Sequence, residues 1–454
     1  MASRTRFKKV AIPLLVISAL ALTACSAGGS DANSNGKQDI TMWFWGAPPA
    51  RQDALNENLV DAFNDSQDDY SLTVEYRNSV DDDIQVALSS GQGGPDVVYG
   101  SGPSFVSPYA QAGKLLPMDE YADEFGWNDT ILESVLQAGT VDDSLYALTT
   151  STGSNGVFYS KSVLEDNGWE VPTTIDEMTT IMDDAIDKGM YGALAGNQGF
   201  QPTNANFSTQ FLTSVAGPDN MYAALSGDMP WTDQVFVDAI DASKEWYDKG
   251  YLGGTDYNNI NISTSLQLLS DGKSPFALAP TIAFQWAGDY FNEEAGNVDD
   301  LGFFALPSIN EDLASPLYPL SEVNSLSINA SSKNPDGAAA VIDFMMQPEF
   351  LKKMTVSWPG YFGIPLKDAA LDPADYTGLS AKFVTVFNDM TEAYNTGNYG
   401  YSTTTFFPPI TSQDFIDIDT VWNDQMTTEE YLSKVDTDFQ AELADGAVSP
   451  VPAP

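Results

Sequence analysis

Near the start of the chain, the hydrophobic residues switch repeatedly between two periods. Apolar residues alternate over residues 72–76, and residues 40–45 and 96–99 are short apolar runs. Both patterns are typical of β-strands. Between them, residues 55–63 and 80–88 carry apolar side chains at helical spacing. Strands that are separated by helices pair in parallel, so this pattern predicts an open α/β sheet. Ligands of such sheets bind beyond the carboxyl ends of the strands.

The middle of the chain mixes the same two periods less regularly. Strands are predicted at residues 157–159 and 276–278, and helices at 173–188, 232–250 and 335–345. We place the start of the 232–250 helix at Thr232, as its N-cap. We find no repeat of fixed period, so the sequence predicts a second mixed region rather than a repeat protein.

The first 25 residues have the pattern of an export signal. Four basic residues precede an apolar run over residues 10–22, and small residues then lead to Cys25, the only cysteine of the chain. The run is shorter than the ~20 residues that cross a bilayer. The arrangement resembles a bacterial lipoprotein signal, which implies lipidation of Cys25 and removal of residues 1–24. An ordinary secretory signal with an incidental cysteine is the alternative. Residues 26–38, rich in Gly, Ser and Asn, are expected to form a flexible linker.

Composition then narrows the chemistry. The chain has no histidine and a formal net charge of −45. The absence of histidine excludes His-activated nucleophiles and His-ligated metals. The large negative charge disfavours nucleic acid as a partner. Beyond the signal only Arg51 and Arg77 supply guanidinium groups, which disfavours an anionic ligand. The acidic run at residues 81–83 lacks the spacing of a calcium loop. We expect neither a metal nor a cofactor.

Several blocks of sequence resemble the extracellular solute-binding proteins of ABC importers, in the maltose-binding-protein-like carbohydrate branch. Ser160 and Pro275 depart from the family pattern, in which Asn and a small residue are usual. The resemblance runs over roughly residues 39–445. The blocks are residues 94–98, 109–118, 144–148 with 157–161, 271–286, and 332–344.

This resemblance implies an α/β fold of two lobes, a periplasmic-binding-protein-like clamp in which each lobe is a mixed sheet flanked by helices. The ligand would lie between the lobes, and a hinge motion would close them. We expect an N-terminal lobe of residues 39–149 and 326–375, a C-terminal lobe of residues 150–319 and 380–445, hinge crossings near 149–153, 319–325 and 372–380, and a loose tail of residues 446–454.

A sugar site requires aromatic faces and planar polar side chains, because a sugar presents C–H faces between rings of hydroxyls. Trp286 in a loop and Trp45 at a strand end are the principal candidates for stacking. At each of the other positions, core packing, helix capping or a turn is the alternative. The predicted ligand contacts are Trp286, Trp45, Trp43, Tyr99, Ser101, Asn206, Phe207, Gln210, Gln285, Glu322, Asn324, Trp358 and Tyr361.

The function implied by the resemblance is non-catalytic binding of a neutral sugar, an oligosaccharide, and its delivery to the permease subunits of an ABC transporter. The protein would be a monomer, lipid-anchored at the extracellular face of the cytoplasmic membrane. Two alternatives stay open. A secreted glycoside hydrolase needs only two carboxylates, although the chain lacks eight βα repeats. A peptide- or amino-acid-binding lipoprotein would require charged partners, and arginine is scarce.

Overall fold

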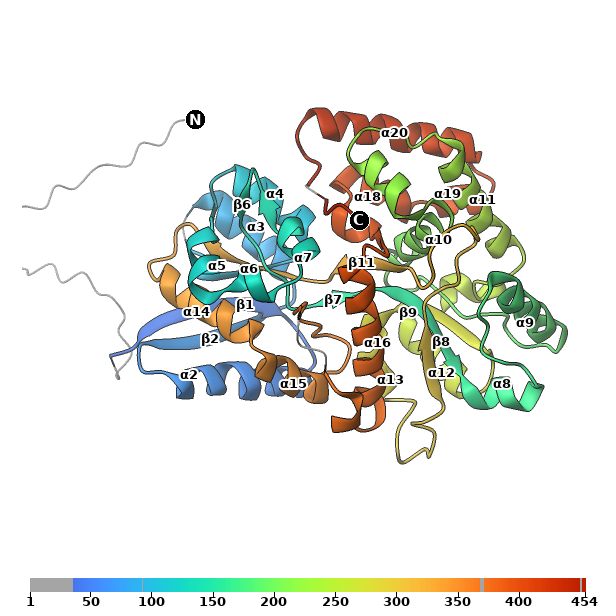
Figure 1. Ribbon diagram of the computed structural model, residues 1–454, viewed down its shortest axis with the longest axis horizontal. Helices are drawn as coiled ribbons and strands as arrows, with labels where there is room; N and C mark the ends of the chain where they lie inside the picture. Colours follow the sequence, from blue (N-terminus) through green and yellow to red (C-terminus); the bar gives the residue numbers. More distant parts are fainter. Residues whose placement is uncertain (1–35, 92, 368–370, 450) are drawn as a thin grey trace, which may run out of the picture.

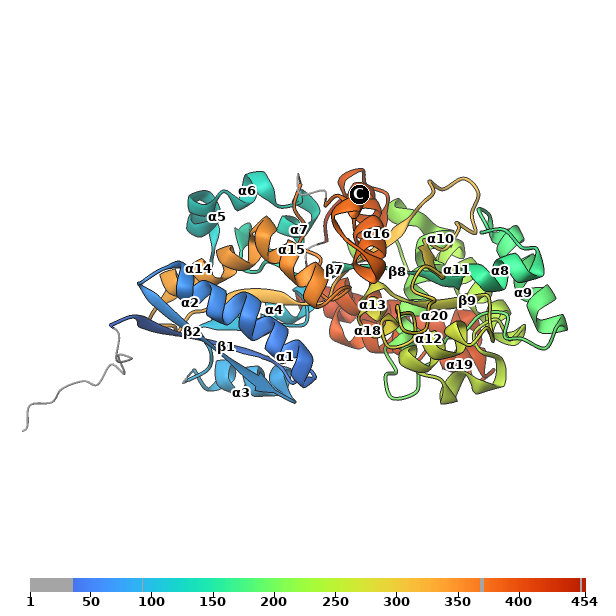
Figure 2. The same cartoon turned by 90° about the horizontal axis from the view of Figure 1, so that it is seen from below.

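The computed structural model describes residues 36–91, 93–367, 371–449 and 451–454. Cys25 and the signal lie outside the described residues. The chain forms two α/β lobes that lie side by side, with a small sheet and the long helix α16 (Gly378–Asn395) between them (Figure 1, Figure 2). None of the described helices is both long and apolar enough to cross a lipid bilayer.

The first lobe is built on a five-stranded sheet in the order β2-β1-β3-β12-β4. Strand β1 (Gln38–Trp45) pairs in parallel with β2 (Tyr70–Arg77) and with β3 (Val97–Gly100), as the alternating strand and helix patterns predict. Strand β12 (Ser325–Asn329) runs antiparallel to β3 and to β4 (Leu115–Leu116). A segment from the last third of the chain therefore completes the sheet of the first lobe.

Helices cover both faces of this sheet, and its inner strands β3 and β12 are accordingly buried on both sides. In β1, Ile40, Met42 and Phe44 are fully buried. The helix after β2 ends at Gly91, whose φ of 63° lies in the left-handed region that favours glycine. The helices are α1 (Pro49–Leu55), η1 (Asn56–Asp61), α2 (Ala62–Ser66), α3 (Val80–Ser90), α4 (Pro103–Gln111), α5 (Asp119–Phe125), α6 (Trp127–Thr130), α7 (Glu133–Ala138), α14 (Pro335–Met346) and α15 (Pro348–Ser357).

The second lobe has an antiparallel sheet in the order β10-β8-β9, formed by β8 (Asn155–Ser160), β9 (Phe276–Pro280) and β10 (Leu301–Phe304). Helix α11 is capped by Asp233 rather than by Thr232, because the Asp233 carboxylate accepts the backbone N–H of the second helical residue. The helices are α8 (Lys161–Asn167), α9 (Ile175–Asp187), α10 (Thr203–Leu225), α11 (Gln234–Asp248), α12 (Ile262–Ser270), α13 (Phe284–Ala287), α18 (Pro409–Ile416), α19 (Asp419–Trp422) and α20 (Thr428–Ala444).

A third, small sheet lies between the lobes. Strand β11 (Tyr318–Glu322) pairs with β7 (Thr152–Gly153) on one side and with β13 (Tyr399–Tyr401) on the other. Helix α17 (Thr403–Phe406) follows β13 and leads into α18. Three segments that are far apart in the sequence therefore meet at the middle of the molecule (Figure 1).

The end of the chain packs against this middle sheet. The Tyr399 hydroxyl donates a hydrogen bond to the carbonyl oxygen of Ala453 (2.8 Å), and the Tyr401 hydroxyl donates to that of Pro452 (2.5 Å). We expected residues 446–454 to form a loose tail, but these hydroxyls hold its last residues against β13. The proline-rich composition of this segment does not show that its carbonyl oxygens accept hydrogen bonds from tyrosines that are distant in the sequence.

Candidate functional site

A cavity of about 540 Å³ opens between the two lobes. Aromatic side chains from both lobes face it, together with amides and aliphatic groups. None of its described lining residues carries a formal charge, in a chain with 64 acidic residues. The lining consists of Trp45, Tyr99, Gln198, Gly199, Phe200, Asn261, Ile262, Ser263, Pro280, Ile282, Gln285, Trp286, Val323 and Tyr361.

On the first lobe, the cavity lies at the carboxyl ends of two parallel strands, the edge at which ligands of such sheets bind. Trp45 ends β1 and Tyr99 lies near the end of β3. The Trp45 Nε1 donates to the hydroxyl of Tyr361 (2.8 Å), and this hydroxyl is also hydrogen-bonded to that of Tyr99 (2.8 Å). Burial raises the pKa of both tyrosines well above the usual range, so their hydroxyls stay neutral. Tyr361 thereby fixes two aromatic faces of the cleft.

On the second lobe, Trp286 lies on the short helix α13, which is fastened to the first lobe. Arg51 of α1 donates from Nη2 to the Gln285 carbonyl oxygen (3.0 Å) and from Nη1 to that of Ser357 (2.7 Å). The Trp358 Nε1 donates to the Gln285 Oε1 (3.1 Å). We name Arg51, Gln285 and Trp358 the interlobe clasp. The clasp positions the residue just before Trp286, and therefore the indole that faces the cleft.

Several lining residues were not found by sequence analysis. Gln198, Gly199 and Phe200 form a loop before α10, and Asn261 and Ile262 begin α12. Loops carry no period, so no pattern pointed to them. One signal was available, because Phe200 is a large aromatic residue within a polar stretch. Phe200 is 52% exposed, so its ring is accessible from solvent.

Other predicted contacts lie away from this cavity. The indole of Trp43 is covered by the Arg77 guanidinium, 3.5 Å from the ring centroid. Ser101 donates to the Asp81 carboxylate (2.8 Å) and lines a second groove, of about 580 Å³, between α3 and α4 of the first lobe and α17 and α18 of the second. The structure thus places Trp43 in packing against a side chain of the neighbouring strand β2 and Ser101 at a second interlobe surface.

The three predicted contacts on α10 also lie outside the cavity lining. Phe207 is buried and its ring packs against Tyr257 (6.1 Å between centroids). Gln210 is buried and its Nε2 donates to the Gly156 carbonyl oxygen (3.4 Å). Asn206 is only partly buried, and its carbonyl oxygen accepts from the Asn155 side chain (3.5 Å). The apolar and polar faces of α10 both pack inside the second lobe.

Glu322 and Asn324 flank a cleft residue without lining the cleft themselves. Val323 lines the cavity, whereas Glu322 and Asn324 are buried and are not among its lining residues. Burial raises the pKa of the Glu322 carboxyl well above its usual range, because desolvation disfavours the charged form. The Asn324 Oδ1 accepts from Thr149 Oγ1 (3.1 Å) and from the backbone N–H of Thr150 (3.0 Å). The Asn324 side chain therefore connects two distant segments, and the Glu322 backbone pairs with Thr152 of β7.

The predicted turn at the cleft edge contains Trp358 and Tyr361, and only one of the two lines the cavity. Their rings stack with centroids 4.5 Å apart. Tyr361 lines the cavity, whereas Trp358 is fully buried behind it. The predicted contacts that the structure brings together at the cavity are Trp45, Tyr99, Gln285, Trp286 and Tyr361.

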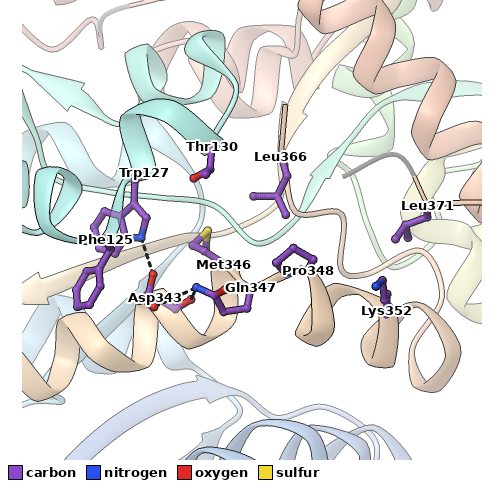
Figure 3. Close-up of a pocket in the computed structure, with 10 residues that line it drawn as sticks. All are labelled: Phe125, Trp127, Thr130, Asp343, Met346, Gln347, Pro348, Lys352, Leu366 and Leu371. Atoms are coloured by element: carbon purple, nitrogen blue, oxygen red, sulfur yellow. Dashed lines mark hydrogen bonds between the residues drawn. The ribbon is translucent and has the colours of Figure 1, made fainter. Parts of the chain in front are cut away.

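A separate pocket of about 370 Å³ lies within the first lobe and contains a stacked aromatic pair (Figure 3). The Trp127 Nε1 donates to Asp343 Oδ1 (3.1 Å), so the indole and the carboxylate that line this pocket are bonded to each other. The second lobe contributes no lining residue to it. Among the described residues, no group of three or more His, Cys, Asp and Glu is placed to hold a metal ion.

Comparison with known proteins identifies related sequences and folds. The family model described as bacterial extracellular solute-binding protein matches residues 58–383. The osmoprotective compounds-binding protein GgtB of Synechocystis sp. is 22% identical over 51% of this chain and 54% of its own length. The diacetylchitobiose binding protein NgcE of Streptomyces coelicolor is 28% identical over 23% of each chain. The matched region thus spans about half, or less, of the length of these relatives.

A solved structure shows the same architecture over the whole molecule. A chitin oligosaccharide binding protein superimposes with a TM-score of 0.74 at 19% identity, covering 90% of this chain and 99% of its own. At that identity the likeness concerns the fold alone. It confirms the predicted fold class, an α/β protein of the solute-binding type.

Proposed function

Because this chain belongs to the bacterial extracellular solute-binding proteins, we propose that it binds a neutral oligosaccharide without catalysis and delivers it to an ABC permease. The family places its members outside the cell. We further propose that the protein is a monomer attached to the outer face of the cytoplasmic membrane by a lipid on Cys25.

The uncharged aromatic lining of the interlobe cavity carries this proposal. An ionic ligand that enters a partly buried site requires a charged partner there, since desolvating an unpaired charge is costly. The described lining offers none. It offers indole, phenol and phenyl faces for the C–H surfaces of a sugar, and amides and hydroxyls for its polar groups.

The names of the relatives support a saccharide. One relative is named for diacetylchitobiose and the superimposed structure for chitin oligosaccharides. The other relative is named for osmoprotective compounds, which makes a smaller neutral solute the second candidate. Aromatic rings from both lobes, Trp45 and Phe200 among them, favour a ligand that reaches both walls of the cavity.

The hydrolase alternative lacks support at this site. A glycosidase requires two carboxylates that flank the scissile bond, and the described lining contains no Asp or Glu. Glu322 is near in sequence, but Val323 faces the cavity in its place. A receptor for free peptides or amino acids would need a partner for the charged termini, which the same lining does not supply.

Calorimetric titration with a panel of neutral oligosaccharides tests the proposal. We expect one class of di- to tetrasaccharide to bind with micromolar or tighter affinity and to be recovered intact. Recovery of cleaved sugar would favour the hydrolase. Binding of a small polyol or an amino acid, with no saccharide bound, would overturn the assignment of the ligand class.

A further inference from the structure

Part of the lining of the interlobe cavity is aliphatic, and we call these residues the aliphatic wall. Ile262, Pro280, Ile282 and Val323 come from three separate segments of the second lobe and the middle of the molecule, and all four are only partly buried. Aromatic rings already provide flat surfaces for the C–H faces of a sugar. A sugar that carries only hydroxyl substituents would leave this additional aliphatic wall against polar groups, so the wall fits an apolar substituent.

Amide donors lie next to this wall in the sequence. Asn261 precedes Ile262, and its Oδ1 is used to cap α12 by accepting from the Thr264 N–H (2.8 Å). Gln285 follows Ile282 by one helical turn, and its Oε1 accepts from Trp358. Among the described residues, the Nδ2 of Asn261 and the Nε2 of Gln285 have no hydrogen-bond partner. Both amides are therefore oriented by their oxygens and keep their N–H groups for a ligand acceptor.

We propose that the cavity selects an oligosaccharide of acetamido sugars, with the acetyl methyl groups on the aliphatic wall and an acetyl carbonyl accepting from Asn261 or Gln285. An acetamido group combines a methyl group with a carbonyl acceptor, which matches the pairing of aliphatic and amide side chains. A 6-deoxy sugar supplies the methyl group without the acceptor. This inference rests on the proposed function, because it specifies the sugar that the same cavity binds.

Three trisaccharides that share one backbone test the effect of the C2 substituent alone. Triacetylchitotriose, cellotriose and the fully deacetylated glucosamine trimer are all β-1,4-linked glucopyranoses that differ only at C2, with acetamido, hydroxyl and ammonium groups respectively. We expect calorimetry to show triacetylchitotriose binding at least tenfold more tightly than the other two, since it gains both burial of a methyl group and a hydrogen bond. Equal or tighter binding of cellotriose, or of the cationic trimer, overturns the inference.

The panel also separates this inference from the proposed function. Tight binding of maltotriose, xylotriose or cellotriose with weak binding of triacetylchitotriose leaves an oligosaccharide receptor and refutes the acetamido preference. Absence of binding for every saccharide refutes both.

Substitutions in the wall provide a second test. Val323→Thr replaces one methyl group by a hydroxyl of similar size, and Val86→Thr, on an α3 side chain that is 69% exposed, is the matched control. Losing one buried methyl contact should weaken triacetylchitotriose binding by about fourfold, whereas the control leaves it unchanged. Ile282→Thr should act like Val323→Thr, and it supplies the test if Val323→Thr lowers the melting temperature. Wild-type affinity in both folded wall variants would overturn the inference.

Discussion

The interlobe clasp makes a specific prediction about Arg51. Its Nη2 forms a hydrogen bond from the first lobe to the Gln285 carbonyl oxygen of the second, while its Nη1 stays within the first lobe on Ser357. Only the first of these bonds must break when the lobes separate. Arg51→Ala should therefore destabilise the closed arrangement relative to an open one.

The magnitude follows from the type of bond. A hydrogen bond from a charged donor contributes about 1.5–3 kcal/mol, and Arg51 is partly buried, so that water screens it incompletely. We take about 2 kcal/mol as the loss of closing free energy, which raises the Kd by at most about thirtyfold if the ligand binds the closed state, and by less the more the ligand-free wild type is already closed. Small-angle scattering of the ligand-free variant should show a larger radius of gyration than wild type.

Arg77→Ala is the matched control, because it removes the other arginine of the described chain. Arg77 pairs with Glu75 and Asp83 at the surface of the first lobe, and such exposed pairs contribute about 0–1 kcal/mol. Calorimetry with the tightest ligand of the panel compares the two variants. A Kd for Arg51→Ala within threefold of that for Arg77→Ala, with unchanged scattering, would refute the role of the clasp in closure.

Three further outcomes can be measured. Trp286→Ala should weaken binding by ~2 kcal/mol, roughly thirtyfold, with little change in the ligand-free melting temperature because the indole is partly exposed; retained affinity with collapsed stability would mark a core residue. Burial raises the pKa of Asp414 to about 6 even though the Lys434 ammonium contacts it. Folding thus favours the protonated acid, and this group lowers the free energy of unfolding as pH rises from about 4 to about 6. Asp414→Asn should gain stability relative to wild type over that range, which thermal melts can follow; a constant difference from pH 4 to pH 7 would contradict this. Cys25→Ala should move the protein from the membrane fraction into the medium, and mass spectrometry of the wild type should find an acylated N-terminal cysteine; an unmodified terminus elsewhere would argue against the anchor.

The strands of the first lobe were predictable because their signal is local. Residues 40–45 and 72–76 carry their own periods, and the helix between them requires parallel pairing. The middle sheet had no such signal. Strand β7 (Thr152–Gly153) is too short to show a period, and it pairs with a strand that no nearby residue specifies. Pairing between distant segments is decided by the assembled fold.

The residues of the candidate site also fall into those that a local pattern predicts and those that only the assembled fold shows. Trp45 was predictable because the end of a parallel strand locates the ligand edge of a sheet. Glu322 was misplaced relative to the cavity by one residue, since Val323 lines the cavity at the bend that follows β11 and no sequence period locates that bend. Phe200 and Asn261 lie in segments without a period. Their proximity to Trp286 results from the packing of separate loops, which a single sequence does not encode locally.

The sheet between the lobes also affects the order of folding. Its pairings join residues such as Thr152 and Glu322, 170 positions apart, and closing so long a loop costs entropy before any contact offsets it. We expect this sheet to form late, like the pairing of β12 with β3, whose residues are at least 225 positions apart. Because β13 (Tyr399–Tyr401) completes it, a chain released before Tyr401 would lack part of its centre rather than an outer edge. Its two lobes would then be left with an incomplete sheet between them.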